Sequence, residues 1–124
     1  MEILQIEATK YTPQIILDPD GYISIKGKSY PENSFEFYEP IIDWIENYFT
    51  LTNTTKTIID IHIVYFNSSS SKVFFDIFDI VDEYNNSHHI DINWLYDKEN
   101  ENVYESGEDF IEDFKNLKIN LISI

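Results

Sequence analysis

The stretch that decides the fold is Ile58-Ile59-Asp60-Ile61-His62-Ile63-Val64-Tyr65-Phe66, which continues into Asn67-Ser68-Ser69-Ser70-Ser71-Lys72. β-Branched and aromatic residues fill its first part, and their alternation predicts a strand that buries Ile59, Ile61, Ile63 and Tyr65. After the serines, apolar residues recur at steps of three and four with acidic residues between them, which predicts an amphipathic helix ending near Tyr84. A central strand therefore enters a helix through a serine corner, defined here as residues 67–72.

The serine corner holds more hydroxyl groups than helix capping requires. A helix begins with unpaired backbone N–H groups, and Asn67 or one of the next three serines can accept a hydrogen bond from them. Exposed hydroxyls at the positive end of a helix also accommodate a covalent phosphate, and Lys72 lies about one turn further on as a counter-charge. Composition alone favours the simpler interpretation, a cap followed by a polar turn.

Two further blocks of sequence flank the corner. One is Gly27-Lys28-Ser29-Tyr30-Pro31-Glu32-Asn33 followed by Phe37-Tyr38-Glu39-Pro40-Ile41, and the other is Trp94-Leu95-Tyr96 with Glu105-Ser106-Gly107-Glu108. Together with Tyr65-Phe66-Asn67-Ser68-Ser69-Ser70-Ser71-Lys72, these blocks agree in order and spacing with the SiaC family of biofilm-regulating phosphoproteins. The chain resembles that family over nearly its whole length.

The resemblance implies a STAS-like α/β domain, similar to anti-sigma-factor antagonists, in which a mixed sheet carries helices mainly on one face. It also implies a non-enzymatic phosphoprotein that switches partners. In the family a threonine directly after the corner asparagine typically accepts the phosphate, and Ser68 holds that position here, with Ser69 and Ser70 as less favoured neighbours. The implied partners are a SiaB-like protein kinase, a SiaA-like phosphatase and a SiaD-like diguanylate cyclase, which the unmodified form binds and activates.

Two sets of residues are expected to contact partners. Pro31 disfavours a helical conformation at the residue before it, so an irregular surface turn is expected to present Tyr30, Pro31, Glu32 and Asn33. In the serine corner, the residues around the phosphate acceptor are expected to contribute as well: Asn67, Ser69, Ser70 and Lys72.

Composition bounds the class of protein. With 124 residues, nine Phe, nine Tyr and two Trp, the chain fits one domain with a sizeable core. The net charge of −15, from 23 acidic residues against eight lysines and no arginine, argues against binding nucleic acid or an anionic membrane surface. No segment has the length of a membrane span and the start lacks the basic residues of a signal peptide, so a cytoplasmic protein is expected.

The absence of cysteine excludes disulfides and thiolate chemistry.

The rest of the pattern predicts alternating strands and helices. Strands are expected at 3–6, 12–17, 22–27, 90–96 and 118–122, the second and third joined as a hairpin by turn-forming residues 18–21. A helix is expected from about Glu39 with Pro40 near its first position, because proline inside a helix removes a hydrogen bond. A later helix at about 103–114 is expected to be interrupted or bent at Gly107, and residues 51–56 should form a polar loop. This order favours a single domain, residues 1–124, with parallel crossovers in a mixed sheet.

Other clusters carry weaker signals. His88-His89 lack a third metal ligand at useful spacing, and residues 97–101 lack the glycine and terminal glutamate of a calcium loop. Asp60 and His62 fit a satisfied pair on the strand better than an acid–base site. Because motifs for a nucleophile elbow or a phosphate loop are absent too, neither a metal, a cofactor nor enzymatic activity is expected. The acidic charge leaves a rival function open, a phosphorylation-independent inhibitor or immunity-type protein that binds a basic surface.

Overall fold

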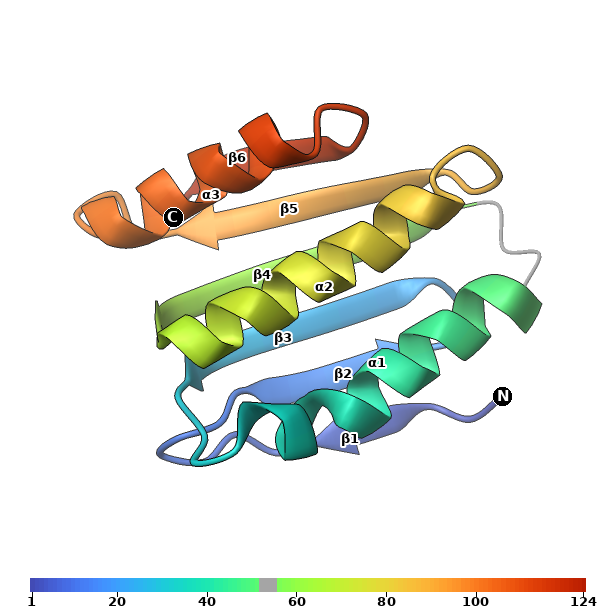
Figure 1. The fold of residues 1–124 in the computed structure, drawn as a ribbon, viewed down its shortest axis with the longest axis horizontal. Coiled ribbons are helices and arrows are strands. Elements are labelled where there is room, and N and C mark those ends of the chain that lie inside the picture. The colour runs from blue at the N-terminus through green and yellow to red at the C-terminus, as the bar shows by residue number, and fades with distance from the viewer. Residues whose placement is uncertain (52–55) are drawn as a thin grey trace.

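The computed structural model of the chain describes residues 1–51 and 56–124, and in this part it holds six strands and three helices (Figure 1). The strands are β1 (Leu4–Ile6), β2 (Gln14–Asp18), β3 (Tyr22–Ser29), β4 (Thr57–Phe66), β5 (Ile90–Tyr96) and β6 (Lys118–Ser123). The helices are α1 (Ser34–Leu51), α2 (Ser68–Tyr84) and α3 (Glu101–Asp113). The strands predicted from the sequence are confirmed with small differences at their ends. The polar loop predicted at 51–56 falls mainly on 52–55, which lie outside the described residues.

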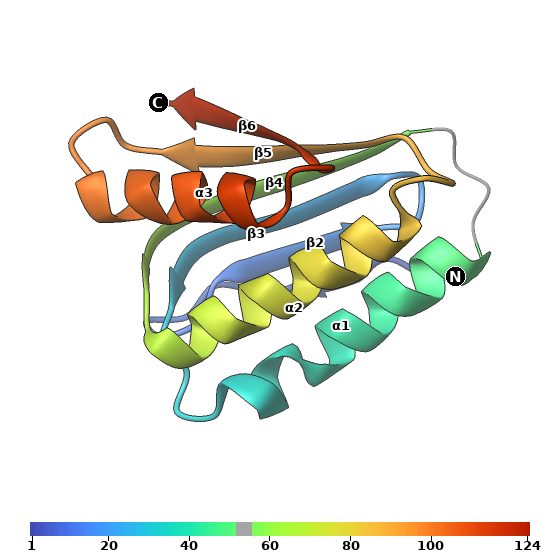
Figure 2. The ribbon, with the colours of Figure 1, turned by 45° about the horizontal axis from the view of Figure 1, so that its top comes forward.

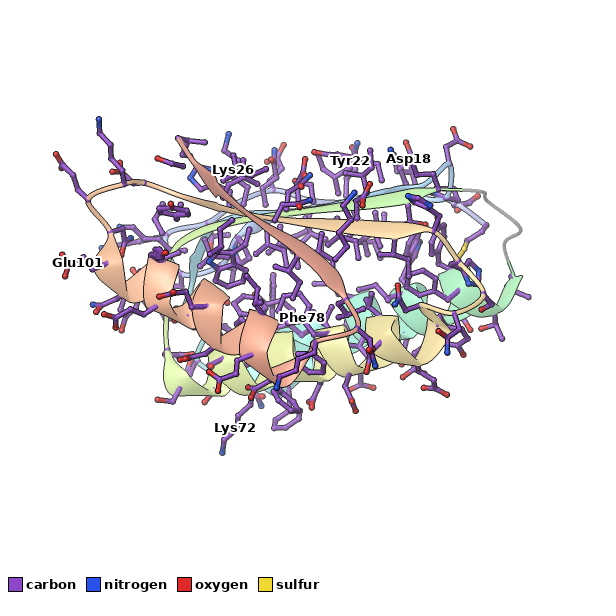
Figure 3. The ribbon with its side chains drawn as sticks, turned by 90° about the horizontal axis from the view of Figure 1, so that it is seen from above. Asp18, Tyr22, Lys26, Lys72, Phe78 and Glu101 are labelled. Atoms are coloured by element: carbon purple, nitrogen blue, oxygen red, sulfur yellow. The ribbon has the colours of Figure 1, made fainter. Side chains whose placement is uncertain are left out.

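The strands form one sheet in the same order as they occur along the chain. β1, β2 and β3 are antiparallel neighbours, whereas β3, β4, β5 and β6 are parallel and are joined by α1, α2 and α3. Parallel crossovers have one preferred hand, so successive steps in one direction put every connecting helix on the same face. Figures 2 and 3 show all three helices below the sheet and its other face uncovered. The predicted mixed α/β fold with helices on one face is confirmed.

The core lies between the sheet and the helices. On β4, Ile59, Ile61 and Ile63 are 1 % exposed each, and they meet the apolar face of α2. That face comprises Val73, Phe74, Ile77, Phe78 and Val81, the three- and four-residue spacing seen in the sequence. This packing holds α2 against the strand that precedes it, so the serine corner between them has a fixed position.

The start of α1 differs from the prediction. The helix begins at Ser34 rather than near Glu39, and Pro40 lies inside it. Asn33 begins the helix, because its side-chain oxygen accepts a hydrogen bond from the Glu36 N–H at 3.1 Å. Pro40 leaves the Glu36 carbonyl without its usual donor, but both residues are exposed and water can replace that bond. The buried side chains on either side of the proline, Tyr38 and Ile41, keep the helix continuous.

The end of β4 also differs from the prediction. Gly27 of β3 pairs with Ile63, but the next residue of β3 pairs with Tyr65, so Val64 is an extra residue in β4. Such a bulge inverts the alternation of side chains beyond it. Tyr65 is therefore 53 % exposed instead of buried. Phe66 takes the core side, with its ring 5.4 Å from that of Phe74.

The expected interruption at Gly107 is absent, since α3 is continuous through this residue. A Cβ atom at Gly107 would lie 2.5 Å from the Leu121 side chain and 2.6 Å from that of Trp94. The glycine therefore lets α3 approach the sheet closely, and the helix tolerates its lower propensity because the packing on Trp94 compensates.

Candidate functional site

The serine corner has the local structure that the sequence predicts. Asn67 has an extended backbone conformation and its side-chain oxygen accepts a hydrogen bond from the Ser70 N–H at 2.9 Å, so it caps α2. Ser68 is the first residue of the helix, and Ser68 and Ser69 are exposed. The prediction of an exposed Ser68 at the start of a helix that ends at Tyr84 is confirmed.

Ser70 has a different environment from its neighbours. Its side chain is fully buried, and its hydroxyl accepts a hydrogen bond from the Ser29 hydroxyl at 2.8 Å. Since Ser29 donates its one hydroxyl hydrogen there, the Tyr38 hydroxyl donates to Ser29, at 2.6 Å. Burial raises the pKa of Tyr38 well above its ordinary value, against the opposing effect of the Ser29 hydrogen bond. The burial of Ser70 argues against both roles expected for it, alternative phosphate acceptor and direct partner contact.

The surface turn predicted to contact partners, residues 30–33 and called the contact loop below, lies beside the serine corner. The Asn67 N–H donates to the Ser29 carbonyl at 3.1 Å, which joins the end of β3 to the start of α2. One residue further on, the Tyr30 ring meets the Tyr65 ring edge-on at 5.4 Å and the Tyr11 ring at 5.3 Å. The structure thus brings both sets of predicted contact residues to one end of the sheet.

The members of the contact loop differ in exposure. Glu32 and Asn33 are exposed, Tyr30 is half-buried and Pro31 is buried. Next to them is a shallow groove of about 630 Å³, lined by Thr9, Tyr11, Thr12, Tyr30, Pro31 and Glu32. Sequence reasoning missed Tyr11 and Tyr65 as members of this surface. Tyr11 lies outside any periodic segment, and the exposure of Tyr65 depends on a bulge that no local pattern indicates.

Lys72 lies four residues after Ser68, so the two side chains share one face of α2 about one turn apart. Lys72 is exposed, and the ion pairs found among residues 1–51 and 56–124 do not include it. It lines a small cavity between α2 and α3 with Ser71, Phe75, Ser106, Asp109, Phe110 and Asp113. A lysine at this position can approach a negative group on the first turn of the helix.

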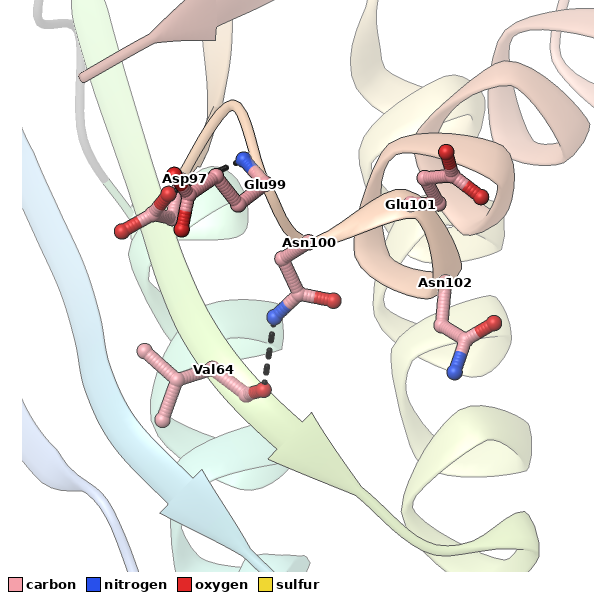
Figure 4. A pocket seen from close by; sticks show the side chains of 6 residues that line it. All are labelled: Val64, Asp97, Glu99, Asn100, Glu101 and Asn102. Atoms are coloured by element: carbon pink, nitrogen blue, oxygen red, sulfur yellow. Dashed lines mark hydrogen bonds between the residues drawn. The ribbon is translucent and has the colours of Figure 1, made fainter.

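On the other side of the bulge is an open pocket of about 520 Å³ lined by Val64, Asp97, Glu99, Asn100, Glu101 and Asn102 (Figure 4). Asn100 donates to the Val64 carbonyl at 3.0 Å, and its side-chain oxygen accepts from the Val103 N–H at the start of α3. Asp97 accepts from the Glu99 N–H at 3.0 Å. These side chains therefore organise the turn and cap α3.

Histidine and carboxylate side chains do not converge on a metal-binding arrangement anywhere in the described part of the chain. His89 lies 3.9 Å from Asp91, which also contacts Lys118 at 3.1 Å and Lys56 at 3.6 Å. The hydrogen bond from Lys118 is the largest of the effects that lower the pKa of Asp91. None of the described helices is both long and apolar enough to cross a bilayer.

Comparisons with known proteins agree on one family. Residues 6–124 match the family described as SiaC family regulatory phosphoprotein. An uncharacterized protein of Pseudomonas aeruginosa (strain UCBPP-PA14) is 38% identical over 115 residues, which are 91% of this chain and 90% of that protein. The crystal structure of apo-SiaC from Pseudomonas aeruginosa has a TM-score of 0.90 at 34% identity, covering 99% of this chain and 100% of that one.

A second solved structure adds a partner for the relative. SiaC bound as an activator to the diguanylate cyclase SiaD of Pseudomonas aeruginosa also has a TM-score of 0.90 at 34% identity, covering 98% of this chain and 99% of that one. Both the match over residues 6–124 and the identity to these relatives span nearly the whole chain. The protein therefore belongs to the SiaC family of regulatory phosphoproteins.

Proposed function

We propose that this protein is a non-enzymatic partner switch whose state is set by reversible phosphorylation of Ser68. The observation that carries the proposal is an exposed serine hydroxyl at the first position of α2, directly after the asparagine that caps the helix. A kinase transfers the γ-phosphoryl group of ATP to the Ser68 oxygen, which loses its proton, and releases ADP. Hydrolysis by a phosphatase restores the serine and releases inorganic phosphate.

The first turn of α2 suits a phosphate group on physical grounds. A phosphoserine carries roughly 1.5 to 2 negative charges at neutral pH, and the unpaired N–H groups and dipole of a helix N-terminus stabilise negative charge. Lys72 on the same face supplies a cation. The modification should therefore leave the fold intact, and its effect should fall on partners.

Among the four serines, exposure narrows the choice of acceptor. Ser70 is inaccessible because its hydroxyl is buried against Ser29, whereas Ser69 is exposed and remains the competitor of Ser68. The position directly after Asn67 and the shared face with Lys72 favour Ser68.

The output partner proposed for the unmodified form is a diguanylate cyclase, as for the SiaC relative that activates SiaD. The surface proposed for partners combines Ser68, Ser69 and Lys72 of α2 with Tyr30, Glu32 and Asn33 of the contact loop. A partner docked there must desolvate an added phosphate or provide a cation for it, which without a cation costs several kcal/mol. Phosphorylation should therefore release the cyclase.

The test uses the full chain with a SiaB-like kinase, ATP and the cyclase, and maps the modified residue by mass spectrometry. We expect Ser68→Ala to block phosphorylation and keep cyclase binding, Ser69→Ala to be phosphorylated normally, and Ser68→Thr to restore the modification. Ser68→Asp should weaken cyclase binding about tenfold or more. Efficient phosphorylation of Ser68→Ala would disprove the residue assignment, and equal cyclase affinity of the phosphorylated and unmodified proteins would disprove the switch.

The same experiment separates the rival function, an acidic inhibitor that works through its charge of −15 alone. An inhibitor of that kind would bind its target equally well before and after phosphorylation, and its affinity would fall steeply with added salt.

A further inference from the structure

The two layers of the molecule carry very different charge. The helices hold 14 of the 23 acidic residues, four on α1, four on α2 and six on α3, against a single lysine, Lys72. The six strands hold three acidic residues and three lysines. In Figure 3, Tyr22 and Lys26 project from the uncovered face of the sheet, on the side away from Lys72. The uncovered face therefore carries little of the negative charge of the chain.

The carboxylates of the strands already have partners. Asp60 accepts hydrogen bonds from two uncharged side chains, at 2.8 and 3.0 Å. Asp18 accepts a hydrogen bond from a backbone N–H of the following turn at 2.9 Å. Asp91 contacts Lys118 at 3.1 Å and Lys56 at 3.6 Å. These carboxylates are therefore satisfied within the molecule.

Two lysines of β3 have no such partner within the described part of the chain. Lys26 and Lys28 are exposed, and the ion pairs found there do not include them. They lie two residues apart on the strand, so both side chains point to the uncovered face. Burial and the charge of Lys26 hold the pKa of His62, its neighbour on β4, below its ordinary value, against a smaller opposing effect of Asp97. At His62, positive charge therefore outweighs negative charge.

Exposed tyrosine rings lie beside these lysines. Tyr65, the partner of Lys28 across β3 and β4, is 53 % exposed, and Tyr11 is 52 % exposed. The Tyr30 ring lies between them and meets each of them edge-on. Lys10 is exposed and outside the described ion pairs, and its Nζ atom lies 5.8 Å from the centre of the Tyr11 ring. Together these side chains form what we call the lysine–tyrosine surface: Lys10, Tyr11, Lys26, Lys28, Tyr30 and Tyr65.

We propose, on the basis of the function proposed above, that the lysine–tyrosine surface binds an acidic segment of the diguanylate cyclase. Charge complementarity favours this occupant, because lysines that form no ion pair among the described residues can meet carboxylates of a partner. The tyrosines suit an interface as well, since each ring buries a large apolar area and keeps a hydroxyl for hydrogen bonding.

The lysine–tyrosine surface is continuous with the residues around the phosphate acceptor. Tyr30 belongs to the contact loop, and the residue before it, Ser29, accepts a hydrogen bond from the Asn67 N–H at the start of α2. A phosphate on Ser68 would therefore lie near the bound acidic segment, repel it and compete for its lysines. A basic segment would instead be attracted to the phosphate. An acidic occupant thus accounts for the proposed release of the cyclase on phosphorylation.

The net charge of −15 opposes an acidic partner only weakly at this surface. Most of the negative charge lies on the helices behind the sheet, and exposed charges more than about 8 Å apart are largely screened at physiological ionic strength. Direct contact between the unpaired lysines and carboxylates of the partner can therefore exceed the repulsion.

The first test measures the affinity of the whole chain for the cyclase by isothermal titration calorimetry. Lys28→Glu should weaken binding about tenfold or more, and Lys28→Gln should weaken it less, because it removes the attraction without adding repulsion. The matched control is Lys115→Glu, which makes the same change in net charge at an exposed lysine beside the C-terminal end of α2, outside the described ion pairs. This control should bind like wild type. Circular dichroism should show that all three variants are folded.

The second test identifies the occupant by cross-linking with a carbodiimide, which joins a lysine amine to a carboxylate as an amide with loss of water. Peptide mapping by mass spectrometry should show Lys10, Lys26 or Lys28 of this chain joined to Asp or Glu residues of the cyclase. Cross-links that run only from carboxylates of this chain to lysines of the cyclase would overturn the proposal, as would the absence of cross-links at these three lysines.

The acidic occupant and the phosphorylation switch fail in different ways. If Ser68→Asp releases the cyclase while Lys28→Glu binds it like wild type, the acidic occupant is wrong and the switch stands. Equal weakening by Lys28→Glu and Lys115→Glu would also overturn the acidic occupant, because net charge alone would then decide the affinity. If the wild-type chain does not bind the cyclase at all, both proposals fail.

Discussion

Ser68 and Ser70 stand two residues apart in the first turn of α2, yet they face opposite environments. Ser68 is exposed, whereas Ser70 is fully buried and bonded to Ser29. An α-helix advances about 100° per residue, so positions two apart lie on nearly opposite sides of its axis. The comparison teaches that one run of serines has two environments: one side leaves hydroxyls exposed to solvent, and the other holds the helix start to β3 and α1 through Ser29 and Tyr38.

The largest expected difference between the two sides comes from placing a charge on each. Ser70→Asp puts a carboxylate without a cation into a buried hydroxyl cluster and should lower the free energy of unfolding by about 3 kcal/mol or more. Ser68→Asp adds the same charge in solvent at the positive end of the helix and should change it by about 1 kcal/mol or less. Urea denaturation of both variants measures the contrast. Equal losses would mean that the two serines share one environment.

Removing the shared partner of the buried hydroxyls should have the next largest effect. Ser29→Ala leaves the hydroxyls of Tyr38 and Ser70 without their bonds to Ser29 and should cost about 1–3 kcal/mol of stability, measured by urea denaturation. The exposed control Ser69→Ala should fall within about 0.5 kcal/mol of wild type. In a double-mutant cycle, Ser29→Ala with Tyr38→Phe should cost less than the sum of the single changes.

Alkaline pH should reduce the stability that the buried hydroxyl cluster of Ser29, Tyr38 and Ser70 provides, and should not affect the exposed serines. Burial raises the pKa of Tyr38 in the folded protein above that in the unfolded chain. The stabilisation by the neutral Tyr38 hydroxyl is therefore fully present below about pH 10, where the unfolded tyrosine titrates. It is lost as the pH rises from there toward the pKa of the folded state. The free energy of unfolding should fall by at most about 1.4 kcal/mol per pH unit, the value for one proton bound differently in the folded and unfolded states. Tyr38→Phe should flatten the stability curve between pH 10 and 11. An unchanged slope in this variant would contradict the assignment; Tyr22→Phe, at a less buried tyrosine with a raised pKa, is the control.

The smallest effect should come from the cap that both sides share. Asn67→Ala removes the acceptor for the Ser70 N–H and should cost about 1 kcal/mol, seen as a lower melting temperature. Asn67→Asp keeps an acceptor oxygen and should retain most of the stability. A neutral Asn67→Ala would show that the serines can cap α2 in its place.

Much of the architecture could be predicted because local signals agree with the tertiary packing. The alternation on β4, the spacing of Phe74, Ile77 and Phe78 on α2, and the turn residues before β3 each describe one element and its buried side. The burial of Ser70 was also within reach, because it precedes Phe74 by four residues and Ile77 by seven and thus shares their face.

The sequence predicted the wrong environment or conformation at three residues, Tyr65, Pro40 and Gly107, because contacts with other elements decide it there. The alternation of β4 indicated a buried Tyr65, but the bulge that exposes it arises from pairing with β3. The general rule against proline inside helices failed at Pro40 because the carbonyl it leaves unpaired is exposed to solvent. Gly107 indicated a bend, whereas its missing side chain makes room for Trp94 and Leu121. Neighbours in space, which a single sequence does not show, decided each case.

The strand order has a consequence for how the chain folds. Every neighbour in the sheet is also a neighbour along the chain, so each pairing closes only the loop through the intervening turn or helix. The β2–β3 hairpin closes a short loop, whereas each parallel pairing closes a longer one, such as the pairing of Tyr22 with Ile58, and therefore costs more loop-closure entropy and forms more slowly. The β2–β3 hairpin can form first, and each helix–strand unit can then add to it as it leaves the ribosome. On this route β6 is the last of the six described strands to join the sheet, so the packing of α3 on Trp94 and Leu121 is completed only at the final step.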